Sequence, residues 1–581
     1  MRHKRTRVTL FLAVALAALV ALSAACGSKK AATTTPTATA TATTTGGLPA
    51  DAAPADQQIF RVNNQAEANT VDPNAASYTY EINLARELYI GLFNQDPKTG
   101  ALVPWAASQV PTQANGGIAA DGVTYTVKLK PGLKWSDGSP VTAQDFVYGI
   151  LRGYDSNVSG SGYYGFITTI KGSDCAYKLK ADSPTYTQDI ANCFKDSVVA
   201  VDQSTLKLVS SGASASFLYN FTLPITFAVP KANVEQLGKG FGQATAATQM
   251  VVDGPFKVKE WVAKDHVTLV PNPSYTAGSK PYLQQVVLRF IEDANQSYNA
   301  YQSGQLDATN FPAALYPTIQ KDATLSAQIQ QEDEFGVRWI SVDKTIAPWN
   351  NAEFVLAVNQ ATDRSAIAKD VFFGLRKAWA SPCNASVVDC QPDIFDKAYG
   401  YNLDSAKAHL AKAYPNGNPP TVTLNIINDP TIKSFGATLQ QQWKAIGVNV
   451  DVKVVDQKTA RADFKAHKSG MQITGWGMDY ADPTDLWTVW VTGGGNNLGS
   501  YSNKQYDALA AKQDATLDPA ARKQVLTQLQ QLLASDPPVI PFAVVLTTQL
   551  FKPYVKGIVH SPFDAIFIGD QNLEKIYIAK H

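Results

Sequence analysis

A strand, a turn and a capped helix follow one another between residues 123 and 151, and this order predicts a mixed α/β fold. Residues 123–129 (VTYTVKL) alternate apolar and polar side chains, as a strand with one buried face does. Gly and Pro within residues 131–138 indicate turns. Thr142 and Asp145 then form a variant capping box that opens a helix. The buried stripe of that helix is expected to contain Phe146, Val147, Ile150 and Leu151.

The later half of the chain alternates helical and strand patterns, which favours an α/β domain with a partly parallel sheet. Apolar spacing, caps and breakers predict helices over 363–373, 405–414 and 519–534. Strands are predicted over 422–427, 448–455 and 539–545. The chain has 581 residues, of which 45% are apolar and 17% charged, so it can form several large cores.

The first 26 residues have the layout of an export signal. A basic start is followed by the apolar run 8–22 and by small residues that end at Cys26. The sequence LSAAC followed by Gly27 resembles a bacterial lipobox, which implies cleavage after residue 25 and lipidation of Cys26. Ser23 stands where such motifs usually have Leu, and ordinary secretory cleavage near Ala25 is the alternative. Removal of residues 1–25 leaves 46 basic and 49 acidic residues, a net charge of −3.

Residues 26–56 are predicted to form a tether between the anchor and the folded body. Residues 31–47 are almost entirely Ala and Thr, and such a tract cannot bury enough surface to offset the entropy of ordering it. A lipid at Cys26 would then hold a soluble body at the outer face of the cytoplasmic membrane. The near-neutral charge argues against a nucleic-acid partner, because neutralising phosphates requires a basic surplus.

The remaining four cysteines form two local pairs, Cys175 with Cys193 and Cys383 with Cys390. In an exported protein this pattern predicts two disulfides that staple surface loops. A metal site is the alternative, but the chain contains no CxxC motif and no nearby His supports one.

The motifs of common enzymes are missing, so we expect no catalytic residues, no metal and no cofactor. The sequence contains no HExxH, GxSxG or P-loop pattern. Residues 160–165 (GSGYYG) match GxGxxG but lack the preceding strand of a dinucleotide site. Residues 493–497 (GGGNN) have no following Lys or helix cap, and a connecting loop is the simpler interpretation than a phosphate site.

Residues 125–152 (YTVKLKPGLKWSDGSPVTAQDFVYGILR) closely resemble extracellular solute-binding proteins of family 5, the oligopeptide- and dipeptide-binding components of ABC importers. The resemblance continues through 253–275, 301–308, 356–374, 475–487 and 501–518. It implies a bilobed, periplasmic-binding-protein-like α/β fold of type II, in the large cluster C form with an extra domain in the first lobe.

The resemblance also implies domain limits. We expect a first lobe built from residues 57–93, 200–308 and 540–581, an extra domain over 94–199, and a second lobe over 309–539. A ligand would be enclosed between the lobes, with closure stabilised by contacts that only the closed state makes.

The segment 475–487 (GWGMDYADPTDLW) is the strongest candidate for the ligand site. Asp482, Pro483 and Asp485 are interpreted as N-cap, first helical residue and capping-box partner of a helix. Asp479 lies outside this cap, and it matches the aspartate that holds the α-ammonium group of the ligand in peptide-binding family members. A solvated loop aspartate is the alternative.

Further pocket residues are implied by the same resemblance. Trp476 would wall a side-chain pocket, and its neighbours Gly475 and Gly477 would let the ligand backbone approach. Trp476 could instead be an ordinary core residue. The remaining predicted ligand contacts are Tyr480, Thr79 and Tyr80.

Two departures from the family pattern affect the predicted ligand. Residues 471–474 (MQIT) carry no Arg where some oligopeptide binders place a cation for the C-terminal carboxylate, and Val355 stands where relatives usually have Arg. Carboxylate anchoring is therefore open. We expect a monomeric, non-enzymatic protein that captures peptides and delivers them to the permease subunits of an ABC importer. The alternatives are another solute, such as an oligosaccharide or a metal chelate, and a surface receptor lipoprotein without a transport role.

Overall fold

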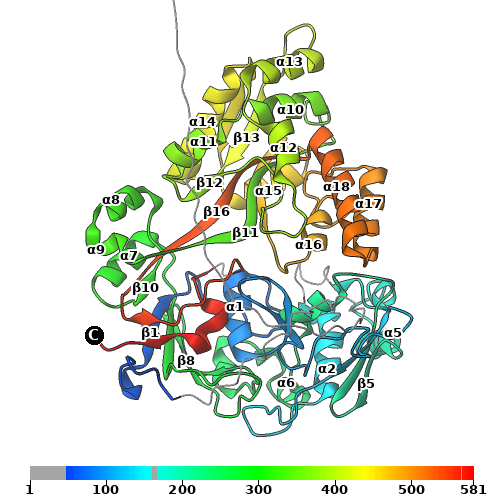
Figure 1. The fold of residues 1–581 in the computed structure, drawn as a ribbon, viewed down its shortest axis with the longest axis vertical. Helices are drawn as coiled ribbons and strands as arrows, with labels where there is room; N and C mark the ends of the chain where they lie inside the picture. Colours follow the sequence, from blue (N-terminus) through cyan, green and yellow to red (C-terminus); the bar gives the residue numbers. More distant parts are fainter. Residues whose placement is uncertain (1–46, 160–166, 564–565) are drawn as a thin grey trace, which may run out of the picture. The chain divides into compact units, whose positions relative to one another are not determined.

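The computed structural model describes residues 47–159, 167–563 and 566–581. The predicted signal segment, Cys26 and the GxGxxG match at 160–165 lie outside the described residues. Within the described chain, one mixed sheet of eleven strands runs through the molecule in the order β14-β13-β15-β11-β16-β10-β1-β9-β8-β7, with β12 also paired to β16 (Figure 1). Its strands are β1 (Ile59–Asn63), β7 (Phe256–Val262), β8 (His266–Pro271), β9 (Gln285–Arg289), β10 (Ala308–Thr309), β11 (Ile329–Val342), β12 (Arg376–Ala378), β13 (Val422–Ile426), β14 (Val450–Val454), β15 (Met471–Gly477) and β16 (Val539–Phe551).

Two long strands, β11 and β16, connect the two halves of this sheet. The first part of β11 pairs with β16 from Ile329 to Asp333, and the register then shifts before pairing resumes at Val337. Beyond this shift β11 also pairs with β15, whereas the far end of β16 pairs with β10. We call the part built on β1 and β7–β10 the first lobe, and the part built on β13–β15 the second lobe. Residues 334–336 of β11, at which the pairing with β16 is interrupted, therefore lie where the chain passes between the lobes.

The second lobe has helices on both faces of its sheet (Figure 1). Strand β11 contributes Ile340 and Val342 to the core beneath α10, α13 and α14, and Val337 and Trp339 to the core beneath α16–α18. The helices of this lobe and of the segment leading into it are α7 (Ala294–Gln302), α8 (Tyr316–Lys321), α9 (Ala323–Ser326), α10 (Ala352–Gln360), α11 (Arg364–Ala366), α12 (Pro392–Tyr399), α13 (Leu403–Ala413), α14 (Pro430–Lys444), α15 (Gln457–Lys465), α16 (Pro483–Trp487), α17 (Lys504–Ala515) and α18 (Pro519–Ser535).

The elements predicted in the later half are present, with ends shifted by a few residues. Helix α18 begins where the Asp518 side chain accepts a hydrogen bond from the Ala521 amide at 2.8 Å, and it buries Leu526, Leu529 and Leu533. Burying each such leucine contributes about 1.5–3 kcal/mol. Strands β13 and β14 are parallel, as the alternation of helices and strands predicts. The helix predicted over 363–373 comprises α11 and a π-helical turn, Ile367–Val371.

The first lobe carries an additional three-stranded sheet with the order β4-β6-β5. Strand β4 buries Tyr125 and Val127 on one face, which confirms the predicted alternation. The capping box of α2 is also confirmed, with the Asp145 carboxylate accepting from the Thr142 amide at 2.8 Å. The boundary predicted at residue 199 falls inside β5. The remaining elements are α1 (Thr79–Leu88), β2 (Phe93–Gln95), β3 (Leu102–Pro104), β4 (Thr124–Lys128), α2 (Ala143–Gly153), α3 (Ser156–Ser159), α4 (Ser173–Ala176), α5 (Tyr186–Phe194), β5 (Val198–Asp202), β6 (Thr205–Val209), α6 (Lys231–Leu237), β17 (Val555–Lys556) and β18 (Tyr577–Ile578).

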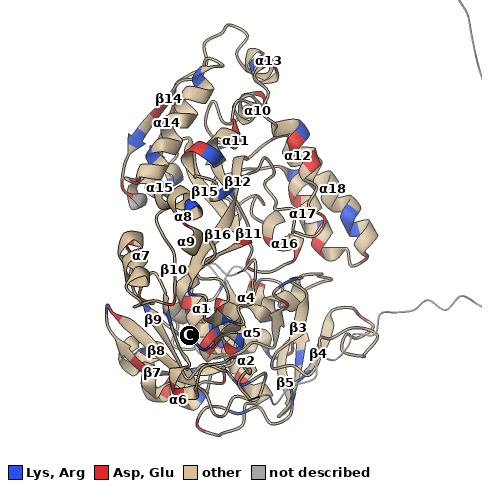
Figure 2. Cartoon of the chain, turned by 60° about the vertical axis from the view of Figure 1, so that its left-hand side comes forward, with Lys and Arg blue, Asp and Glu red and all other residues tan. Residues whose placement is uncertain are grey.

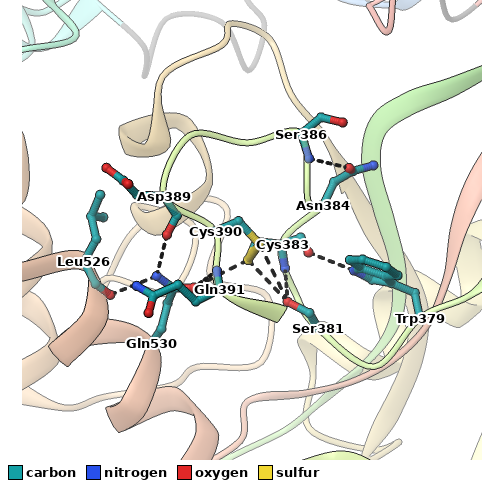
Figure 3. Close-up of a disulfide and its surroundings, with 10 residues drawn as sticks. All are labelled: Trp379, Ser381, Cys383, Asn384, Ser386, Asp389, Cys390, Gln391, Leu526 and Gln530. Carbon is teal, nitrogen blue, oxygen red and sulfur yellow. Dashed lines mark hydrogen bonds between the residues drawn. A yellow bond between two sulfur atoms is a disulfide. The ribbon is translucent and has the colours of Figure 1, made fainter. Parts of the chain in front are cut away.

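Both predicted disulfides are present. Cys175–Cys193 joins α4 to α5, and Cys383–Cys390 closes a short loop before α12. Figure 3 shows that Gln530 of α18 holds the second loop, because its amide donates to the Asp389 carbonyl at 2.9 Å and accepts from the Gln391 amide at 2.8 Å. The two disulfides therefore fasten local loops and lie in different parts of the fold.

Acidic and basic residues are interspersed along the helices and strands (Figure 2). Across the described ranges, no three His, Cys, Asp or Glu side chains are grouped so that they could share a metal ion. In the same ranges no helix has the length and apolar character needed to cross a membrane.

Candidate ligand-binding site

Strand β15 presents one edge that is largely open. On one side it pairs with β11, from Met471 opposite Val342 to Gly477 opposite Gly336. On the other side β13 pairs with it only at Met471, opposite Leu424. Beyond Met471, no strand of the described residues pairs with this edge. An open edge of this kind can accept the backbone of an extended ligand as an additional strand.

The two glycines of β15 have different surroundings. A Cβ at Gly475 would lie 2.5 Å from the Val337 carbonyl oxygen and 2.7 Å from Cδ of Arg338, so a side chain there requires its neighbours to move. A Cβ at Gly477 would meet nothing within 4 Å. Gly475 therefore permits the arginine to lie across the strand, whereas Gly477 leaves open space next to it.

Asp479 follows β15 in a loop whose backbone is fixed by a buried carboxylate. The Asp479 amide donates to Oδ2 of Asp485 at 2.9 Å, and the Trp476 indole donates to the same oxygen at 3.2 Å. The prediction that Asp485 is a capping-box partner is therefore wrong. Asp485 is 1% exposed and turns toward the loop, where it accepts the two N–H groups that precede the helix.

Asp482 is the N-cap of α16, as predicted, and its side chain accepts from the Thr484 amide at 2.9 Å. The same carboxylate forms a bidentate ion pair with Arg522 of α18, whose Nη2 and Nη1 atoms donate to its two oxygens at 2.6 and 2.7 Å. Arg522 also donates to Thr484 and Gln513. The helix start that follows the Asp479 loop is therefore tied to α18 by a partly buried cation.

The site favours a positive group on electrostatic grounds. Burial, and then the charge of nearby Asp479, raise the pKa of the Asp485 carboxyl well above its ordinary value. Two adjacent carboxylates repel each other when both are ionised. The raised pKa favours the neutral form of Asp485, so the negative charge that a bound cation would meet is that of Asp479.

The loop also contacts the first lobe. Gln95 of β2 accepts from the Ala481 amide at 2.8 Å and donates to the Asp479 carbonyl at 3.3 Å. Tyr480 stacks on Tyr219, with ring centroids 5.6 Å apart, and is 4% exposed. Asp514 at the end of α17 accepts from the Ser216 amide at 3.0 Å. These contacts fasten the two lobes together beside Asp479.

Cavities lie on both faces of β15. The larger, of about 490 Å³, is bounded by β11, β12, β13 and β15 and includes Gly475 in its wall. The smaller, of about 80 Å³, is lined by Trp339, Trp476 and Trp490. Trp476 thus walls a small pocket and also packs against the core beneath α16–α18.

The predicted contacts from the first lobe lie at the start of α1. Thr79 is exposed, and Tyr80 packs against the core of the first lobe and stacks on Tyr78 at 5.5 Å. The first-lobe side chains that reach the Asp479 loop are instead Gln95 and Tyr219. Tyr480 has little surface left for a ligand in this arrangement. The roles of Thr79, Tyr80 and Tyr480 in ligand binding stay predictions.

Comparison with known families matches residues 101–498, well over half of the chain, to the bacterial extracellular solute-binding proteins, family 5 Middle. The chain belongs to this family. It is therefore a solute-binding protein that acts outside the cytoplasm, and not an enzyme.

Individual relatives of this family member cover nearly its whole length. The periplasmic oligopeptide-binding protein OppA of Salmonella typhimurium is 26% identical over 592 residues, which are 99% of each chain. A probable deoxycholate-binding periplasmic protein of Escherichia coli, YgiS, is also 26% identical, over 92% of this chain and 96% of its own. The solved Escherichia coli murein tripeptide binding protein MppA matches with a TM-score of 0.73 and 24% identity, over 90% of this chain and 99% of its own. This likeness confirms the predicted cluster C fold.

Several residues of the site were not predicted from the sequence. Gln95 and Tyr219 are far from the 475–487 segment in the chain and lie in no motif. Arg338 and Arg376 line the 490 Å³ cavity, although the family pattern places its cation within residues 471–474. The signal in the sequence is a charged residue at position 338 in a strand pattern, residues 337–342, that contains no other charge.

Proposed function

We propose that this protein captures short peptides outside the cytoplasm and delivers them to the permease of an ABC importer. The main support for this proposal is the open edge of β15, which ends at the loop that contains Asp479. A peptide that pairs with this edge gains main-chain hydrogen bonds that do not depend on its sequence. Its terminal ammonium group then meets the carboxylate of Asp479.

The relatives support a peptide as the ligand. OppA of Salmonella typhimurium is named for oligopeptides, and it aligns over nearly the whole chain. We further propose that residues 1–25 direct export and that a lipid on Cys26 tethers the protein, as a monomer, to the outer face of the cytoplasmic membrane. Growth with labelled palmitate, comparing the wild type with Cys26→Ser, tests the anchor by the presence of label on the protein.

Asp479 provides the direct test of peptide capture. Removing one member of a buried charge pair costs about 2–5 kcal/mol, so Asp479→Asn is expected to weaken binding of a random tri- to pentapeptide pool by about 30-fold or more. Asp451→Asn removes a half-exposed carboxylate of β14 in the same lobe and serves as the control. Isothermal titration calorimetry measures both. Equal affinities for the wild type and Asp479→Asn would exclude the ammonium contact.

A different solute is the second candidate, because a relative of the same identity is named for deoxycholate. The two candidates predict different masses. Native mass spectrometry of the protein purified without denaturation identifies a bound peptide series in the first case and a single neutral or steroid-like mass in the second.

A further inference from the structure

The loop that the Cys383–Cys390 disulfide closes contacts the residues at which the chain crosses between the lobes. Asn384, which directly follows Cys383, donates from its side-chain amide to the Glu334 carbonyl oxygen at 2.7 Å, and it is 6% exposed. Glu334 belongs to the part of β11 at which the pairing with β16 is interrupted. The disulfide loop, residues 383–390, therefore bonds to the backbone between the lobes at a point that the sheet does not hold.

The crossing residues, 334–336, are also bonded to the first lobe and to the ligand-site loop. The Phe335 amide donates to the Pro562 carbonyl at 3.0 Å. Pro562 follows β17, a strand that contributes a side chain to the core of the first lobe. The Phe335 carbonyl accepts from the amide of Met478, the residue before Asp479, at 2.7 Å. The backbone of two adjacent residues is thus held by the disulfide loop, by the first lobe and by the loop that contains Asp479.

The disulfide fixes the two ends of this loop to each other (Figure 3). At one end, Cys383 is fully buried and places Asn384 against the crossing residues. At the other end, Asp389 has a φ of 58°, a left-handed conformation that is uncommon for residues other than glycine. The Asp389 carbonyl accepts from the Gln530 side chain of α18 at 2.9 Å. Without the covalent bond, Asn384 is joined to this contact only through the intervening backbone, which is then free to relax.

We infer that the Cys383–Cys390 disulfide is a redox-sensitive control of peptide affinity, and that the oxidised protein is the form that captures ligand. The inference rests on the proposed function. In the described arrangement the crossing residues are bonded to both lobes, while Gln95 joins the lobes beside Asp479. Release of the disulfide loop allows the crossing backbone to adopt other conformations. The closed arrangement then becomes a smaller fraction of the protein, and the affinity for an enclosed ligand falls with it.

Cys390 is the half of the disulfide that a reductant reaches, because it is partly exposed whereas Cys383 is fully buried. A thiolate of a small dithiol attacks Sγ of Cys390, the S–S bond breaks, and Cys383 leaves as a thiolate that takes up a proton. The second thiol of the reagent then attacks the reagent sulfur that is bonded to Cys390, and Cys390 is released as a thiol. Two electrons and two protons have passed to the protein, and the dithiol has become a cyclic disulfide.

Peptide titration of the mature protein tests the inference. Isothermal titration calorimetry with the random tri- to pentapeptide pool compares the wild type before and after treatment with dithiothreitol, the double variant Cys383→Ser/Cys390→Ser, and Asn384→Ala. The alanine variant keeps the disulfide but removes the hydrogen bond to Glu334, so it reports on this contact even where the double variant folds poorly.

The reduced wild type, the double variant and Asn384→Ala are each expected to bind the pool about 2- to 10-fold more weakly, as the loss of about one hydrogen bond from the closed state implies. Dithiothreitol is expected to have no further effect on the double variant. Two controls are expected to bind as the wild type does. Cys175→Ser/Cys193→Ser removes the other disulfide, and Ser386→Ala changes an exposed side chain of the same loop.

Hydrogen exchange followed by mass spectrometry does not depend on peptide capture. The amides of Phe335 and Met478 are expected to exchange about 2- to 10-fold faster in the reduced wild type and in Asn384→Ala than in the oxidised wild type. If no form binds the pool while exchange shows this pattern, the proposed function fails and the redox control of the crossing residues stands. Equal peptide affinity of the oxidised and reduced wild type overturns the inference and leaves the proposed function intact. Unchanged exchange together with no peptide binding refutes both.

Discussion

Gln95 is the first-lobe side chain that bonds directly to the backbone of the Asp479 loop, and its replacement by alanine is expected to weaken lobe closure. It makes two hydrogen bonds across the lobes, one from the Ala481 amide and one to the Asp479 carbonyl. Gln95 is 7% exposed, so water does not readily replace these bonds while the lobes remain together. The bonds disappear when the lobes separate, and they therefore stabilise only the closed state.

The magnitude follows from the two bonds. A hydrogen bond contributes about 0.5–1.5 kcal/mol net, so Gln95→Ala is expected to shift the equilibrium toward the open form by about 1–3 kcal/mol. This corresponds to about a 5- to 150-fold smaller ratio of closed to open protein. Because ligand is enclosed in the closed form, its affinity is expected to fall by the same factor.

Two measurements check this effect. Isothermal titration calorimetry gives the affinity for the random tri- to pentapeptide pool, and small-angle scattering gives the radius of gyration with and without peptide. Gln95→Glu keeps the acceptor for the Ala481 amide and is expected to lose about half of the free energy. Gln113→Ala removes an exposed glutamine of the first lobe and is expected to change neither quantity. An unchanged affinity together with unchanged scattering for Gln95→Ala would refute the reasoning.

Two further predictions concern the loop's supports. Arg522→Met leaves the Asp482 carboxylate, 7% exposed, without its cation, and is expected to destabilise the protein by about 3–5 kcal/mol. The control, Lys523→Met on the exposed face of the same helix, is expected to change stability by about 0.5 kcal/mol or less. Chemical denaturation measures the free energy of unfolding of both variants. The raised pKa of Asp485 means that the folded state binds a proton more tightly than the unfolded state, so the wild type loses stability as the pH rises from the ordinary carboxyl pKa of about 4 toward the raised value. Asp485→Asn lacks this titration, so the difference in Tm between the variant and the wild type is expected to rise in favour of the variant between pH 4 and pH 8. If the Tm of both proteins changes with pH in parallel, the burial of an ionisable group at position 485 is contradicted.

Local patterns in the sequence predict local structure here because the partners are close in the chain. The capping box of Thr142 and Asp145 joins residues three apart, and Cys383 and Cys390 are seven apart. The parallel pair β13 and β14 follows from one helix between two strands. In each case the bonding geometry is set by the intervening backbone, which the residue types specify.

The interpretation of Asp485 shows where such reasoning fails. An acidic residue three positions after an N-cap usually turns back to the cap. Here the Trp476 indole and the Asp479 amide compete for the carboxylate, and both come from the preceding loop. The pattern fixes the helix start but not which donors the fold brings to the side chain. Gln95 presents the same difficulty, since its partners are more than 380 residues away in the chain.

The two arginines of the cavity become neighbours only through the long strands that join the lobes. Arg338 and Arg376 both flank β16, and the register shift before Val337 sets which face Arg338 occupies. A shift of one residue would turn Arg338 to the opposite face, toward the core that holds Trp339. Glu334, which accepts a hydrogen bond from Arg338, lies within the same shift. This ion pair therefore lies at the point where the chain crosses between the lobes. An Arg338→Met substitution removes this ion pair, and we expect it to change the equilibrium between the open and closed forms, which small-angle scattering with and without peptide measures.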